Sequence, residues 1–469
     1  MALNSEPAKY HGGLIGANWN DARPRAWAAR DYAAMLRETM CYVADRQERD
    51  SSCPWLDMKF DIITGRDFPD DDPVRGKGTV CGWVQGRALE SLAGHAAWLE
   101  SAAADESKAL AARLDNIMRK LLVNLRRVRA MNSGHLFFFM TPEGHPFSLD
   151  ADQHRKPIWL DAQSPVNFSD IFGAKGMCAA ARRLGDKEAG REARDWLDQI
   201  MRALWNGEIV SDQQALDTTN PVTPMPGRHT QAPFMLMIGA AAQCAALDQN
   251  AESIQAGLRI IQYLLDKHTN LPGRFEWMRP WLFWEFIGDD GEPYRSEGRI
   301  LSDPGHALEF AGLALKFTGI AKKCRGNTER RLGKIHAVEK TMIRVIQANY
   351  ENGVQPAGGI CKLTDLLADK PVNSDMPWWS LPEAMRAALH GALAADEPSL
   401  RGMCLRIHAR CHDAFAAHYV RPDRYFMAVQ TRSADGRVAQ VIPATADADP
   451  GYHTGLCLID CLRLMSELT

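Results

Sequence analysis

Twelve segments with helical periodicity, joined by links that alternate between short and long, constrain this chain more than any other feature. Apolar residues recur in them at helical spacing, and Ala, Leu, Met, Arg and Glu, which favour helices, dominate their composition. The segments are residues 25–49, 82–104, 107–131, 166–185, 188–206, 229–248, 251–268, 305–319, 330–349, 380–396, 398–419 and 452–468.

The link lengths predict a closed double ring of helices. After the second, fourth, sixth and tenth segments the link has about one to three residues, and after the eighth it has about ten. After every odd-numbered segment it has about twenty to thirty-five residues. Because short links make antiparallel neighbours, all even-numbered helices would start at the same end. We therefore predict an all-α fold, an (α/α)6 barrel with long loops and small β-hairpins at one end, built as a single catalytic domain over residues 1–469. An open α-solenoid is the structural alternative.

Two of the long loops carry patterns typical of hairpins. Leu136–Thr141 and residues 145–149 flank a turn at Pro142-Glu143-Gly144. Arg424–Thr431 and Val438–Ile442 flank a second turn at residues 433–436. Each pair is predicted to form an antiparallel hairpin.

Composition and charge exclude several classes of function. The chain is 46% hydrophobic and 24% charged, with a net charge of −3 and no basic block, which argues against a nucleic-acid or anionic-membrane partner. It has no apolar N-terminal signal and no long uncharged apolar run, so we expect a soluble, cytoplasmic protein. Its eleven cysteines lie mostly inside apolar helical segments, which predicts buried thiols rather than disulfides.

The stretch Asp303-Pro304-Gly305-His306-Ala307-Leu308-Glu309 combines a helix start with two titratable side chains. Pro and Gly end a loop there, and an apolar helical run follows. His306 and Glu309 are three residues apart and share one helix face, so the carboxylate can hold the imidazole in one tautomer. Because His306 lies in the first turn, it is expected to face whatever lies above the helix end.

The other inner helices also begin with polar side chains. In five of the six, the first turns or the residues just before them carry Arg, His or Glu; the residues are Arg87, His229, His306 with Glu309, Glu383 behind Trp378 and Trp379, and His453. The fourth segment offers Asn167 and Asp170 instead. Isolated charges would be costly at a buried centre without partners, so we expect these groups to converge on one pocket.

The motifs W-x-Q-G-R, G-H-x-x-E, W-W-x-x-x-E-A and a C-terminal Tyr-His resemble the N-acylglucosamine 2-epimerase superfamily, over about residues 25–468. That family includes N-acylglucosamine and cellobiose 2-epimerases and mannose isomerases, and its fold is an (α/α)6 barrel. The resemblance implies the following roles: general acid/base for His306 and His453, orientation of His306 by Glu309, a second active-site glutamate at Glu383, and sugar binding by Arg87 and His229. Trp378 and Trp379 would offer indole faces to the sugar.

Two positions depart from the family pattern. Ala232 stands where the family has Glu in the motif that would begin at His229, and Thr454-Gly455 follows His453 where the family has Pro-Arg. These departures bear on the substrate rather than on the chemistry.

The implied reaction moves a proton at C2 of an open-chain aldose through an enediolate. Histidine suits this task because its pKa lies near neutral pH. Two histidines on opposite sides of the intermediate yield the C2 epimer, whereas one histidine that shuttles the proton to C1 yields a ketose. The sequence leaves both outcomes open.

Two further classes remain as alternatives. A glycoside hydrolase built on the same barrel would need two carboxylates, drawn from Asp161, Asp170, Glu285 and Glu383. A non-catalytic sugar-binding protein is the weaker alternative.

We predict no metal and no cofactor. His229, His306 and His453 lie on three helices without the close-spaced pair typical of zinc sites. The chain also lacks a phosphate-binding glycine-rich loop. A small carbohydrate is the expected partner, and a homodimer is expected by family analogy alone.

Overall fold

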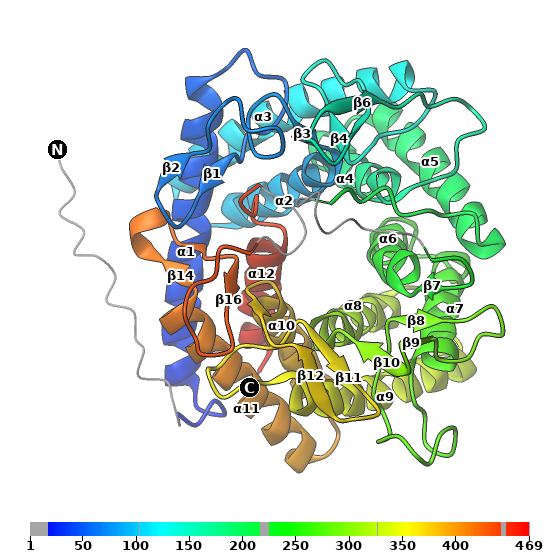
Figure 1. Cartoon of the computed structure of the whole chain (residues 1–469). Helices are drawn as coiled ribbons and strands as arrows, with labels where there is room; N and C mark the ends of the chain where they lie inside the picture. Colours follow the sequence, from blue (N-terminus) through cyan, green and yellow to red (C-terminus); the bar gives the residue numbers. More distant parts are fainter. Residues whose placement is uncertain (1–16, 103, 216–224, 326, 442–446, 469) are drawn as a thin grey trace.

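The computed structural model describes residues 17–102, 104–215, 225–325, 327–441 and 447–468. Within them, twelve α-helices form two concentric rings (Figure 1). The inner ring consists of α2 (Gly82–Ser101), α4 (Phe168–Leu184), α6 (Ala232–Asp248), α8 (Pro304–Lys323), α10 (Ser380–Ala394) and α12 (His453–Glu467). The outer ring consists of α1 (Ala22–Arg49), α3 (Asp105–Met131), α5 (Lys187–Asn206), α7 (Ala251–His268), α9 (Glu329–Gly353) and α11 (Pro398–His418).

The inner helices contact one another around the whole ring. Helix α2 packs on α4, α4 on α6, α6 on α8, α8 on α10, α10 on α12, and α12 returns to α2. Each inner helix is covered from outside by its short-link partner, except that α1 covers α12 across the two ends of the chain. The predicted (α/α)6 barrel is therefore confirmed, and closure of the ring excludes the open solenoid.

Burial differs between the rings as the sequence pattern requires. In α6 every residue from Pro233 to Ala242 is buried, because an inner helix touches neighbours on all sides. In α5 burial follows a stripe with a spacing of three or four residues, from Ala189 to Leu204, so only one face meets the inner ring. All eleven cysteines are free thiols, as predicted. None of the described helices combines the length and apolarity that crossing a bilayer demands.

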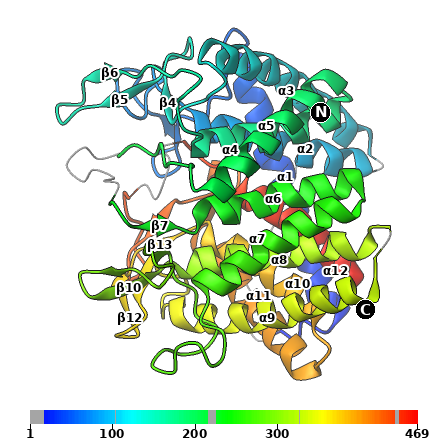
Figure 2. The ribbon, with the colours of Figure 1, turned by 90° about the vertical axis from the view of Figure 1, so that its right-hand side faces the viewer.

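The strands are short and gather at the end of the barrel where the inner helices begin (Figure 2). All pairs are antiparallel: β1 (Phe60–Asp61) with β2 (Arg66–Asp67), β3 (Val80–Cys81) with β4 (Phe139–Met140), β5 (Phe147–Leu149) with β6 (Arg155–Pro157), β7 (His229–Thr230) with β8 (Phe286–Ile287), β13 (Met376–Pro377) with β16 (Thr431–Arg432), and β14 (Val420–Arg421) with β15 (Met427–Ala428). A four-stranded sheet has the order β12 (Lys370–Asn373), β11 (Leu363–Asp365), β10 (Arg299–Ser302) and β9 (Arg295–Ser296).

Both predicted hairpins form at their turns, but each is short, and the strands also pair with segments that the sequence does not predict. In the first loop β4 pairs with β3 and β5 with β6, and a single bridge between Met140 and Pro146 joins the two predicted strands. In the second, β15 pairs with β14 and β16 with β13. The bridge of Arg432 to Val438 and the hydrogen bond from the Ala439 N–H to the Thr431 carbonyl join β16 to the predicted partner. Ile442 lies outside the described residues. Strand pairing depends on which segments the barrel brings together, and the local sequence pattern does not predict this.

The closest approach of two inner helices, α2 and α4, depends on glycine. A Cβ at Gly176 would overlap the carbonyl oxygen of Gly86, and a Cβ at Gly86 would overlap the backbone of Phe172. Their backbones therefore lie too close for any side chain. This contact helps to bring the first turns of α2 and α4 to the same side of the ring.

We expect Gly176→Ala to destabilise the fold. Because the added methyl group meets backbone, which cannot move aside cheaply, the free energy of unfolding should fall by about 1–3 kcal/mol or more. The matched control is Gly319→Ala in α8, where a Cβ meets no heavy atom within 4 Å. There alanine should be neutral or stabilising by up to ~1 kcal/mol. Urea unfolding of both variants measures the difference, and equal stabilities would contradict the packing argument.

Candidate active site

A cavity of about 310 Å³ opens at the loop end of the inner ring. Its walls come from five inner helices and from the loops above them. Six of the eight predicted site residues line it: Arg87, His306, Glu309, Trp378, Trp379 and His453. Glu383 lies buried behind His453, and His229 lies elsewhere. The convergence of inner helix starts thus brings together most of the predicted site.

His306 is held by two carboxylates at the start of α8. Asp303 caps the helix and accepts hydrogen bonds from the backbone N–H groups of Gly305 (2.9 Å) and His306 (3.4 Å). The ring Nδ1 donates to Glu285 Oε2 at 3.0 Å and lies 3.6 Å from Asp303 Oδ2. Burial alone would lower the pKa of His306, but Asp303 and Glu285 outweigh it and raise the pKa to about 9. His306 is therefore an imidazolium at neutral pH.

The prediction that Glu309 orients His306 is wrong, because the hydrogen bond of the ring goes to Glu285 instead. Helical side chains lean towards the N-terminus, so His306 reaches up to Glu285 on the preceding loop, away from Glu309. Glu309 lies deeper, beside Glu383 and His453. Its burial and the proximity of Glu383 raise the pKa of its carboxyl.

His453, the first residue of α12, has the opposite electrostatic environment. Its Nδ1 lies 3.0 Å from Glu383 Oε1, and the other oxygen of Glu383 pairs with Arg386. Burial and the charge of Arg87 lower the pKa of His453 to about 4. The neutral ring donates Nδ1–H to Glu383, which leaves Nε2 as its basic nitrogen.

One indole ring lies beside both histidines. The Trp379 ring is 5.2 Å from the His306 ring and 5.6 Å from the His453 ring, centroid to centroid. Trp378 lies edge-on to His453 at 6.4 Å, and its Nε1 donates to Thr454 Oγ1 at 3.2 Å. Both imidazoles thus lie against a single aromatic ring.

Arg87 contributes a cation whose partners are aromatic. Its guanidinium lies 4.3 Å from the centre of the Phe172 ring and 5.5 Å from that of Tyr452. Its Nε is buried without a hydrogen-bond partner, and within the described part of the chain it forms no ion pair. Below it, Lys175 donates to the Tyr452 hydroxyl at 2.9 Å and lies 3.4 Å from Glu90. The Arg87 charge is available to an oxygen in the cavity.

His229 does not line the cavity, contrary to its predicted place. Helix α6 begins at Ala232, three residues later than predicted, and His229 belongs to β7. Alternation along this strand turns Arg228 and Thr230 into the cavity and His229 outwards, where it pairs with Asp289 at 2.7 Å on the surface. The side chain of His229 is 58% exposed.

Sequence reasoning missed three charged residues around the cavity. The sequence suggests Glu285 only as a hydrolase carboxylate, and no pattern marks Arg228 or Lys362 as a site residue. Lys362, just before β11, donates to Asp303 Oδ2 at 2.6 Å. The sequence marks Asp303 as a helix cap, because it precedes Pro-Gly at the start of a helical segment. Glu285, Arg228 and Lys362 come from loops whose folding no local pattern predicts.

A divalent metal fits this site poorly. Glu309, Glu383 and His453 each offer a ligand atom within 4.8 Å of the others. However, both oxygens of Glu383 are engaged, one by His453 and one by the Arg386 guanidinium, which would repel a cation. The other group with suitable spacing, Asp150, Asp152 and His154, lies in an exposed hairpin turn, where Asp150 already binds backbone N–H groups.

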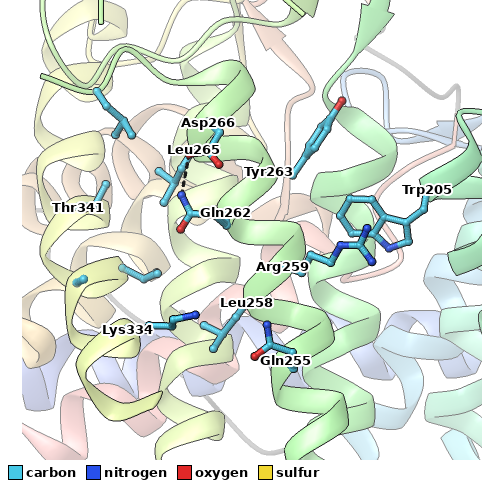
Figure 3. Close-up of a pocket in the computed structure, with 13 residues that line it drawn as sticks. Trp205, Gln255, Leu258, Arg259, Gln262, Tyr263, Leu265, Asp266, Lys334 and Thr341 are labelled. Atoms are coloured by element: carbon cyan, nitrogen blue, oxygen red, sulfur yellow. Dashed lines mark hydrogen bonds between the residues drawn. The ribbon is translucent and has the colours of Figure 1, made fainter. Parts of the chain in front are cut away.

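A second cavity, of about 510 Å³, lies on the outer ring between α7 and α9 (Figure 3). Arg259 stacks on Trp205 there, 3.8 Å from the ring centre. Its charged lining residues are Arg259, Asp266 and Lys334, and no histidine is among them. It therefore lacks an acid–base pair of the kind found inside the barrel.

The sequence profile of the N-acylglucosamine 2-epimerase (GlcNAc 2-epimerase) family matches residues 169–457, more than half of the chain. That range contains His306, Glu309, Glu383 and His453, and Arg87 lies outside it. Among the curated protein sequences compared with the chain, none matches it significantly.

Solved sugar epimerases and isomerases share the fold. A sugar epimerase from a ruminal bacterium superposes with a TM-score of 0.65 at 12% identity, covering 93% of this chain and 98% of its own. The cellobiose 2-epimerase of Spirochaeta thermophila superposes with a TM-score of 0.64 at 14% identity, covering 95% of this chain and 98% of its own. A D-mannose isomerase superposes with a TM-score of 0.62 at 15% identity, covering 92% of this chain and 97% of its own. At these identities the likeness establishes the (α/α)6 barrel alone.

We expect Asp303→Asn to lower the pKa of His306 from about 9 towards the ordinary histidine value of about 6.5. Asparagine still caps the helix, so the change removes charge without removing the cap. NMR titration of the His306 ring, assigned with a His306→Gln variant, measures the shift. The control is Asp186→Asn at the cap of α5, which has no histidine beside it. An unchanged pKa in Asp303→Asn would refute this account of the charge on His306.

Proposed function

Because the chain belongs to the N-acylglucosamine 2-epimerase family, we propose that its barrel cavity interconverts the C2 epimers of an aldose, with His453 and His306 as the groups that move the proton. The observation that carries the proposal is the pair of imidazoles beside Trp379, one neutral and one charged. Two titratable groups whose pKa values are pushed apart by their surroundings are a recurring sign of an acid–base pair.

In the proposed reaction His453 is the base and His306 the acid. Nε2 of neutral His453 takes the C2 proton of the open-chain sugar, and the electrons of the C–H bond pass into an enediolate. Arg87 stabilises the negative charge that develops on the sugar oxygens. The His306 imidazolium then donates its proton to the opposite face of C2, which yields the epimer. The two histidines have now exchanged protonation states, and exchange with solvent restores them.

The rival activities need other arrangements. An aldose–ketose isomerase needs a single base that moves the proton from C2 to C1, which gives the second histidine no proton to carry. A hydrolase needs two carboxylates, but Glu285 and Glu383 are hydrogen-bonded to the histidines. Asp170 is occupied by His135 and the α4 cap, and Asp161 lies exposed in a loop. The charge states of the cavity thus favour epimerisation.

The pH dependence of kcat/KM should be a broad bell. Activity is lost as the pH falls through about 4, because His453 must be neutral to accept a proton. It is lost again as the pH rises through about 9, because His306 must be protonated to donate one. Asp303→Asn should move only the alkaline limb, and it should move that limb to lower pH. A single limb near 6.5, the ordinary pKa of histidine, would contradict the assignment.

Proton NMR in D2O with mannose, glucose, N-acetylmannosamine, cellobiose and substituted hexoses tests the reaction itself. We expect deuterium at C2 together with the epimeric product. Deuterium accompanied by a ketose would identify an isomerase, and cleavage of a glycoside without exchange would identify a hydrolase.

His306→Ala and His453→Ala should each lose about 10²–10⁴-fold in turnover, because each removes a proton-transfer group, with substrate binding partly retained. The control is His336→Ala on the outer helix α9, which should keep wild-type activity because this side chain is 58% exposed and remote from the cavity. Full activity in both site variants would refute both the epimerase and the isomerase.

A further inference from the structure

Arg228 is a cation of the cavity wall that the proposed proton transfer does not use. It precedes β7, and strand alternation directs it to the same side as Thr230, into the cavity. Its guanidinium lies 4.4 Å from the centre of the Phe286 ring. Within the described ranges of the chain no carboxylate lies at ion-pair distance from it. The residue is half-buried and lines the cavity, so its charge lies at the cavity wall without a counter-charge.

Two other cations of the cavity are already paired with carboxylates. Lys362 is paired with Asp303 at 2.6 Å, and His306 is paired with Glu285 at 3.0 Å. In the described portion of the chain Arg87 has no carboxylate partner either, but it is assigned to the enediolate. The remaining carboxyl of the lining, Glu309, has a raised pKa, which disfavours its charged form. An electropositive excess therefore remains on the wall that carries Arg228.

The position of Arg228 relative to the histidines sets which end of a sugar it would meet. Strand β7 pairs with β8 through Thr230 and Phe286, and Glu285, the neighbour of Phe286, holds His306. Arg228 thus lies on the strand next to the segment that holds the acid, on the same wall of the cavity. A sugar with C1 and C2 at the histidines would extend its far end towards this guanidinium.

We propose that Arg228 binds an anionic substituent at the far end of the sugar, so that the substrate is an aldose bearing a carboxylate or a phosphate. This proposal rests on the proposed function, which places C1 and C2 of the sugar at the histidines. A guanidinium presents its N–H groups in a planar fork that matches such oxyanions, and the Phe286 ring holds the fork in place. A neutral hydroxyl would leave the Arg228 charge without a counter-charge in a site that is partly shielded from water.

The test measures C2 deuterium exchange with three matched sugar pairs: glucose and mannose, their 6-phosphates, and glucuronate with mannuronate. The wild type should prefer at least one anionic pair over the neutral one, and the preferred pair distinguishes phosphate from carboxylate. In Arg228→Met, which keeps an apolar stem over Phe286, the ratio of kcat/KM for the anionic to the neutral sugar should fall about tenfold or more. The fall should lie mainly in KM and should shrink at high salt.

The matched control is Arg259→Met, which removes an arginine stacked on Trp205 in the outer groove (Figure 3). Because that residue lies outside the barrel cavity, the ratio should stay at its wild-type value. An unchanged ratio in Arg228→Met, or equal losses for neutral and anionic sugars, would overturn the proposal. A wild type that prefers the neutral pair would do the same.

Direct binding separates this proposal from the proposed function. Isothermal titration of wild type and Arg228→Met with glucose 6-phosphate and with glucuronate needs no turnover. If no sugar exchanges deuterium but one anionic sugar binds in an Arg228-dependent manner, the epimerase is refuted and the anion site stands. If sugars exchange and neither anionic sugar depends on Arg228 for binding, the epimerase stands and the anion site is refuted.

Discussion

Six inner helices that start at the same end of a closed ring bring their first turns into contact, and the site depends on this closure. A first turn has unpaired backbone N–H groups and a positive dipole end, so it suits carboxylate caps and polar side chains. Asp303 illustrates the consequence: it caps α8, and the same carboxylate sets the charge of His306. The packing of α2 on α4 through Gly86 and Gly176 belongs to the same constraint.

Two buried histidines acquire different charge states, one positive and one neutral, because their neighbours differ. Burial disfavours the charged form of both. His306 faces Asp303 and Glu285, whose combined attraction exceeds the desolvation cost. His453 also has a carboxylate, but Arg386 neutralises Glu383, and Arg87 adds a repelling charge. The balance between burial and the surrounding charges thus sets whether each imidazole is protonated at neutral pH.

The loops add charged side chains to the cavity that the inner helices form. Glu285, Lys362 and Arg228 reach the cavity from the segments around β8, β11 and β7. The helices carry the proposed proton-transfer groups, which require fixed geometry, while the segments at the rim carry the charges proposed to select among sugars. The outward turn of His229 and the inward turn of Arg228 follow from one feature, the two-residue period of β7. A shift of one residue in that strand would exchange them.

The sequence by itself determined the barrel, because helical periodicity and the alternation of link lengths are local properties that leave one closed arrangement. It also placed His306, His453, Glu309, Glu383 and Arg87, since each lies at or near an inner helix start, and the family profile covers all but Arg87. Only the tertiary structure decided which carboxylate holds which histidine, how the short strands pair, and that Arg228 rather than His229 faces the cavity. Those outcomes depend on contacts between segments far apart in the chain, and the local pattern of residues carries no information about them.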